Sequence, residues 1–186
     1  MTSCGFGYIA NTGSAKSNGF DFNGRAAVTD DLLAGLSVSY TDAKMTKDLS
    51  ILGVPVEQSG DAVGSPPNVI SPWNVTVSLT YNFTVAGKDG YLRAEDIYRS
   101  HNSGPFNSLI AAAANYAPEI PADPATNQLN LRAGIDWSGV DLALFANNVL
   151  NTHPALGRYQ DNAYSTLFTD NTLRPLTVGA TASYRF

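Results

Sequence analysis

Polar side chains that could bind a ligand lie close together near the C-terminal end of the sequence. His153, Arg158, Tyr159 and Gln160 fall in the last long segment that is predicted to be a loop. Loops on a rigid scaffold carry binding residues more often than the strands that they join. The four side chains therefore predict direct contact with a small ligand, or else residues 151–154 form only the exit of a strand.

Metal chemistry has little support in the sequence. Asp123, Asp161 and Asp170 lie in predicted long loops and could bind a cation, but solvated loop carboxylates are the favoured interpretation. The sequence has a single cysteine, Cys4, and two histidines, which leaves no disulfide framework and no multi-cysteine ligand set. We therefore expect no metal ion, no cofactor and no role for Cys4.

Motifs of nucleophilic, phosphate-binding and zinc-dependent enzymes are also missing from the sequence. It contains no G-x-S-x-G, no Walker loop and no H-E-x-x-H. Residues 87–90, Gly-Lys-Asp-Gly, are predicted to form a turn rather than a phosphate cradle. The sequence thus predicts no catalytic residue and no enzyme activity.

Composition excludes two further classes of protein. The 186 residues include 11 Lys and Arg against 16 Asp and Glu, for a net charge of -5, so no basic stripe is available for nucleic acid. The longest apolar run, residues 109–114, is far shorter than the roughly 20 residues of a transmembrane helix. What remains is an ordered chain that is poor in charge.

Strict alternation of apolar and polar residues is the strongest pattern in the sequence. From Trp73 to Val85 every odd-numbered residue is apolar and every even-numbered residue is polar, which is the period of a β-strand. Residues 129–137 and 176–186 alternate in the same way, and residues 20–28 and 32–41 follow the same period at most of their positions. These segments are rich in Val, Thr, Tyr and Phe, as strands are.

The connections between the predicted strands alternate in length. Short joints at residues 29–31, 86–90 and 138–139 have turn composition, whereas the others are long and span roughly 46–72, 102–127 and 152–173. We therefore expect an all-β, antiparallel up-and-down meander with tight turns at one end and long loops at the other. A short first strand near residues 5–11 would give about eight strands, an even number as in bacterial barrels.

Aromatic residues near both ends of the apolar face predict a transmembrane β-barrel. Strands of about 11–13 residues are long enough to cross a bilayer when tilted. The predicted girdle aromatics are Tyr40 and Trp73 at the long-loop end, and Tyr81, Phe83 and Trp137 at the turn end. A soluble sandwich or lipocalin-like barrel would show the same alternation, but the polar faces carry Ser, Thr, Asn and Gly rather than Lys and Glu.

Four stretches resemble the C-terminal barrel portion of TonB-dependent outer-membrane receptors. Residues 11–22 resemble the strand entry N-G-x-A-x-S-x-G-V-E-L-E, and residues 36–44 resemble the next strand, L-x-x-S-Y-T-D-A-K. Residues 144–151 resemble L-F-V-x-N-L-T-N/D, and residues 174–186 resemble the closing R-P-x-T-x-G-x-x-x-x-Y-x-F. The stretches keep the order of that family and cover most of the chain.

The resemblance implies a receptor in the bacterial outer membrane for a scarce ligand such as a ferric siderophore. Such receptors close a barrel of about 22 strands around an N-terminal plug, and TonB supplies the energy for uptake. The plug and the TonB box have no counterpart in this chain, so residues 1–186 are interpreted as a C-terminal segment of the barrel. The alternative is a self-contained eight-stranded outer-membrane barrel with a structural or adhesive role, and a third hypothesis is a soluble barrel around an apolar ligand.

The resemblance also assigns partners and lumen residues. Tyr184 and Phe186 resemble the C-terminal signal that the barrel-assembly machinery reads, in which an unpaired last strand is offered for edge pairing. Within the family the loop of His153 and Arg158 helps to hold ligand. The side chains expected to line the lumen and pair with one another are Asp21, Arg25, Arg93, Glu95, Arg132 and Asp136.

Asp96 departs from the family pattern, which tends to place an aromatic residue there. In the predicted strand its carboxylate would face lipid, which costs free energy. A bulge between Ala94 and Tyr98 could instead turn the side chain inward. Both interpretations remain open from the sequence.

Overall fold

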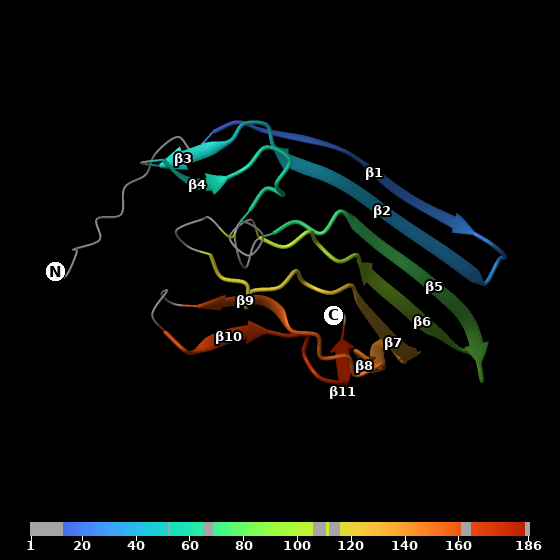
Figure 1. Ribbon diagram of the computed structural model, residues 1–186. Coiled ribbons are helices and arrows are strands. Elements are labelled where there is room, and N and C mark those ends of the chain that lie inside the picture. Colours follow the sequence, from blue (N-terminus) through green and yellow to red (C-terminus); the bar gives the residue numbers. More distant parts are fainter. Residues whose placement is uncertain are drawn as a thin grey trace.

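Seven strands form one antiparallel sheet in a computed structural model that describes residues 13–51, 53–64, 69–105, 111, 116–160 and 165–184 (Figure 1). The strand order is β1-β2-β5-β6-β7-β8-β11. The strands are β1 (Ala15–Ala27), β2 (Leu32–Met45), β5 (Trp73–Val85), β6 (Lys88–Arg99), β7 (Thr126–Trp137), β8 (Val140–Asn147) and β11 (Thr177–Tyr184). Every regular element in the described ranges is a strand, which confirms the all-β meander.

No helix in the described part of the chain has the length and apolar character needed to cross a membrane. The predicted first strand near residues 5–11 lies outside the described residues.

The alternating pattern sets the register of the sheet. β5 has the predicted bounds, and its apolar residues lie opposite apolar residues of β2, as in the pairs Leu36–Val77 and Val38–Val75. Each strand therefore contributes its apolar residues to one face, the apolar face, and its polar residues to the other, the polar face.

The apolar face is not covered by a second layer. The strands of the described sheet pack chiefly against their neighbours in that sheet, and large apolar side chains such as Leu144 and Val178 are 66% and 71% exposed. A soluble sandwich would bury this face against another sheet. A contiguous exposed apolar face of this kind marks a surface that meets lipid or another protein surface.

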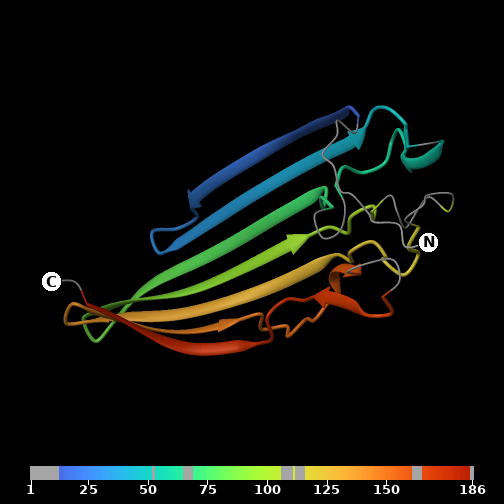
Figure 2. The same cartoon turned by 90° about the vertical axis from the view of Figure 1, so that its left-hand side faces the viewer.

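The two ends of the sheet differ as the sequence predicts. Tight turns gather at one end and long connections at the other (Figure 2); we call them the turn end and the long-loop end. The turn predicted over residues 86–90 is shorter than expected, because Ala86 and Gly87 alone turn the chain and Lys88 already belongs to β6. Both residues have positive φ (51° and 71°), as in the two-residue turns that match strand twist.

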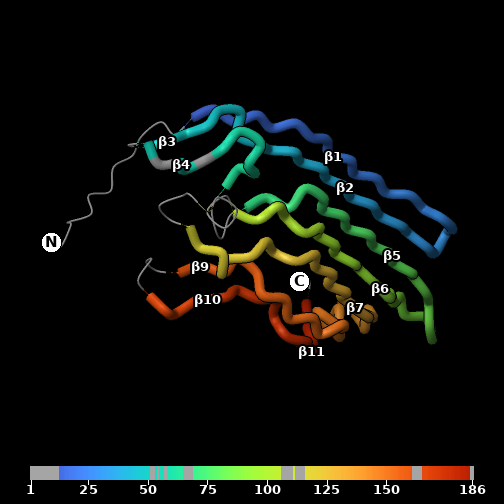
Figure 3. The backbone as a smooth tube through the Cα atoms, in the orientation of Figure 1, coloured from blue at the N-terminus to red at the C-terminus, as the bar shows by residue number. Residues whose placement is uncertain are grey.

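Two small ribbons in the long connections escaped the sequence analysis. β3 (Leu49–Ile51) pairs with β4 (Val54–Glu57), and β9 (Leu156–Gln160) pairs with β10 (Phe168–Asn171). Both ribbons extend the molecule beyond the long-loop end of the main sheet, as the backbone trace shows (Figure 3). Strands of three to five residues are too short to show a clear alternation.

The main sheet is open among the described residues. β1 and β11 form its two edges and are not paired with each other. An open antiparallel sheet of long strands is consistent with part of a barrel wall.

Asp96 lies on the apolar face. β6 pairs with β5 and β7 without a bulge, and Asp96 is directly opposite Val77 on one side and Leu129 on the other. The inward-turning alternative is therefore not what the structure shows.

Polar-face side chains join the strands, although the predicted charge pairing holds only in part. Arg93 forms an ion pair with Glu95 at 2.6 Å. Arg132 instead donates hydrogen bonds to the hydroxyls of Tyr91 and Thr181, both at 2.8 Å, and so reaches across β8. Among the remaining predicted lumen residues, Asp136 accepts a hydrogen bond from the Gly139 amide, whereas Asp21 and Arg25 have no side-chain partner in the described chain.

Candidate functional site

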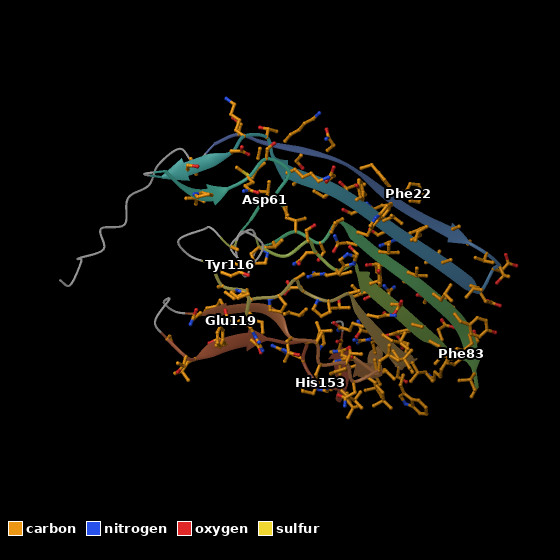
Figure 4. The ribbon with its side chains drawn as sticks, viewed as in Figure 1. Phe22, Asp61, Phe83, Tyr116, Glu119 and His153 are labelled. Atoms are coloured by element: carbon orange, nitrogen blue, oxygen red, sulfur yellow. The ribbon has the colours of Figure 1, made fainter. Side chains whose placement is uncertain are left out.

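The predicted ligand residues are split between two places at the long-loop end. Arg158, Tyr159 and Gln160 belong to β9. His153 is exposed and lies away from the tip of the β9–β10 ribbon (Figure 4). The structure therefore does not bring the four residues together as one cluster, and their contact with a ligand stays a prediction.

Arg158 is already bound to a residue of its own ribbon. Its Nε and Nη2 donate to the two carboxylate oxygens of Asp170 at 2.6 and 2.7 Å, and its guanidinium lies 5.7 Å from the ring centre of Phe168. The bidentate pair lowers the pKa of the Asp170 carboxyl and raises the pKa of Arg158. Gln160 likewise donates to the Ser165 carbonyl. Together with the Arg158–Asp170 pair, this bond stabilises the ribbon of β9 and β10.

Asp123 ties two long connections together. Its carboxylate accepts hydrogen bonds from the Asn102 side-chain amide at 3.0 Å and from the Gly157 backbone amide at 2.6 Å. The Asn102 oxygen in turn accepts from the amides of Asp123 and Gly104, and Asn102 is 2% exposed. Asp123 is thus a structural link rather than a free loop carboxylate, and we call this set the Asp123 clamp.

Asn148 organises the ends of β8 and β11. Its Nδ2 donates to the carbonyls of Thr152 and Arg174 at 3.0 and 2.7 Å, and its Oδ1 accepts from the Thr152 amide. The side chain is 1% exposed and the backbone has a φ of 51°. Asn148 belongs to the motif over residues 144–151, and these hydrogen bonds explain why an asparagine suits this position of the motif.

A cavity of about 610 Å³ opens at the long-loop end beside the Asp123 clamp. Strands β5, β6 and β7 supply its polar wall with Asn74, Arg99, Thr126 and Gln128. The β9–β10 ribbon supplies Leu156 and Asn171, and the segment after it supplies Leu173. None of the four predicted ligand residues lines it. The sequence analysis missed Arg99, whose only signal was its place in phase with Arg93 and Glu95 on β6.

The predicted girdle aromatics lie near the ends of the apolar face. Tyr40 and Trp73 have ring centres 4.6 Å apart, and Phe20 lies within 6.0 Å of both. At the turn end Tyr81 stacks on Phe83, and the Lys88 ammonium lies 5.7 Å from the ring centre of Trp137. Their role at a membrane surface stays a prediction.

The proposed assembly signal is described only in part. Tyr184 ends β11 on the apolar face and is 65% exposed, while Phe186 lies outside the described residues. Recognition of either residue by the assembly machinery stays a prediction. Within the described ranges, no group of three His, Cys, Asp or Glu side chains could hold a metal ion.

An antiparallel meander of long strands with one apolar and one polar face is the arrangement found in the wall of a β-barrel. Residues 1–151 match the family described as TonB dependent receptor-like, beta-barrel. The chain belongs to this family, whose members are receptors and transporters rather than enzymes. No curated protein and no solved structure matches the chain.

Proposed function

We propose that this chain forms part of the barrel of an outer-membrane receptor that takes up a scarce ligand, such as a ferric siderophore, with energy supplied through TonB. In the intact receptor, a plug domain lies against the polar face and the apolar face meets lipid. The long-loop end faces the outside of the cell, where the ligand first meets the protein.

One observation carries this proposal: the family match covers six of the seven strands of a sheet whose apolar face has no second described layer on it. Such a face suits contact with the hydrocarbon core of a bilayer, which supports the outer-membrane location. The cavity at the long-loop end adds an entry site of a size typical for small ligands.

The proposal is tested by uptake in cells that produce the complete receptor containing this chain. Cells deprived of iron are given radioiron as a panel of ferric chelates, and iron accumulation is measured with TonB present and with TonB inactivated. We expect at least one chelate to accumulate only when both the receptor and TonB are present. Iron accumulation that is equal with and without TonB would contradict energy-coupled iron uptake. A lack of accumulation for every chelate of the panel would contradict it as well.

A further inference from the structure

Arg99 gives the cavity at the long-loop end an unpaired cation. It is the last residue of β6, it lines the cavity and it is exposed. No described residue forms an ion pair or a hydrogen bond with its guanidinium. The residues opposite it on the neighbouring strands, Asn74 and Thr126, are neutral, so no charged residue on those strands is paired with it.

Asp123 lines the same cavity but forms no ion pair with Arg99. Both carboxylate oxygens of Asp123 already accept hydrogen bonds, one from Asn102 at 3.0 Å and one from Gly157 at 2.6 Å. These bonds hold the Asp123 carboxylate within the loop structure. A ligand that enters therefore meets the free guanidinium of Arg99, together with the side-chain amides of Asn74 and Gln128.

The rest of the lining sets the character of the ligand. Ile97, Leu156 and Leu173 give the cavity an aliphatic part. Its volume of about 610 Å³ falls within the range of small-molecule sites. A guanidinium binds anionic oxygens in pairs through its fixed fork of donors. The lining thus suits a ligand that has both an anionic and an apolar part.

We propose that Arg99 makes this cavity selective for anionic over neutral ferric chelates. The inference rests on the proposed uptake function and adds the charge of the ligand to it. Iron held by three catecholate groups keeps a net negative charge, whereas iron held by three hydroxamate groups is neutral. The Arg99 guanidinium attracts the anionic catecholate complex, whereas the hydroxamate complex has no net charge for it to attract.

The test is equilibrium binding to the purified receptor in detergent micelles, measured by quenching of tryptophan fluorescence. The probes are a ferric tris-catecholate and a ferric tris-hydroxamate. We expect tighter binding of the catecholate, weakened by added salt. Arg99→Ala should weaken catecholate binding by about tenfold, the loss of one charge-assisted contact, and leave hydroxamate binding unchanged.

Arg25→Ala is the matched control, because it also removes from the polar face a guanidinium that has no partner among the described residues, but Arg25 lies on β1, outside the cavity lining. It should leave both affinities unchanged. Equal weakening of both probes by Arg99→Ala would mean that Arg99 only shapes the cavity, and the inference would be overturned. A wild-type preference for the neutral probe would also overturn it, while TonB-dependent uptake would still support the proposed function.

Discussion

At the scale of single residues, buried hydrogen bonds fix the long-loop end of the sheet. Asn148 satisfies backbone groups from two segments that lie on either side of the β9–β10 ribbon in the sequence, Thr152 and Arg174. A buried backbone group that loses its partner costs more than the hydrogen bond itself contributes. The side chain of Asn148 is therefore worth more to stability than its small size suggests.

Substitution at Asn148 should separate the side-chain effect from the backbone effect. Asn148→Gly keeps the freedom to adopt the positive φ and loses the hydrogen bonds, so we expect destabilisation by about 2 kcal/mol. Asn148→Ala loses both and should cost about 1 kcal/mol more. Urea unfolding of the complete receptor in detergent micelles measures the difference. Equal stability of Asn148→Gly and wild type would show that the hydrogen bonds contribute nothing.

Protonation of Asp170 should loosen the β9–β10 ribbon. Because Arg158 lowers the pKa of the Asp170 carboxyl in the folded protein, its stabilising effect is present above the ordinary carboxyl pKa of about 4 and is lost as pH falls through the lower folded value. Carbonyl chemical shifts of Asp170 give its titration, and protection of the amides of the paired Tyr159 and Thr169 reports the ribbon. The control is Asp170→Asn, whose ribbon should show no response to pH in this range.

At the scale of elements, aromatic rings on the polar face cover glycines of the neighbouring strand. A Cβ at Gly134 would lie 2.4 Å from the Tyr91 ring, and one at Gly179 would lie 2.5 Å from the Phe145 ring. The glycine leaves room for the ring, and the placed Tyr91 hydroxyl then accepts a hydrogen bond from Arg132. Strand pairing and side-chain position thus depend on each other here.

Gly134→Val should displace the Tyr91 ring and break its hydrogen bond with Arg132. We expect a loss of about 1–3 kcal/mol in the free energy of unfolding. Tyr91→Phe is the matched control, because it removes the hydroxyl and keeps the ring over Gly134, and it should cost about 1 kcal/mol. If Gly134→Val were no worse than Tyr91→Phe, the close packing of ring on glycine would have no energetic weight.

The sequence predicts the strands of the main sheet far better than the site. Alternation over Trp73–Val85 predicts that strand because its two faces meet different surroundings along its whole length. The Asp123 clamp joins Asp123 to Gly157, 34 residues away, and no local pattern encodes such a contact. Arg99 escaped notice because a polar residue in phase on a strand looks like any other residue of the polar face.

At the scale of the whole molecule, the open sheet leaves the outer hydrogen-bonding groups of its two edge strands without a partner strand among the described residues. β1 has 13 residues and β11 has eight. Unpaired backbone groups are too costly to remain in lipid. Within the proposed receptor, further strands pair with both edges and close the wall.

The 186-residue chain alone should therefore fail to form a compact, heat-modifiable species after transfer from urea into detergent or lipid. We expect aggregation, relieved when the remaining strands and the plug are supplied. Gel mobility before and after boiling, with circular dichroism alongside, measures both outcomes. A β-rich band that runs compactly until it is boiled would show that the chain closes by itself and would favour the self-contained small barrel.

The Asp123 clamp also determines which segments lie side by side on the surface at the long-loop end. Asn102 and Gly157 come from different connections, yet the clamp holds them beside one carboxylate. An antibody that reads this surface would recognise a discontinuous epitope built from both connections. Antibodies raised against either connection as a linear peptide would then recognise the denatured chain better than the folded one.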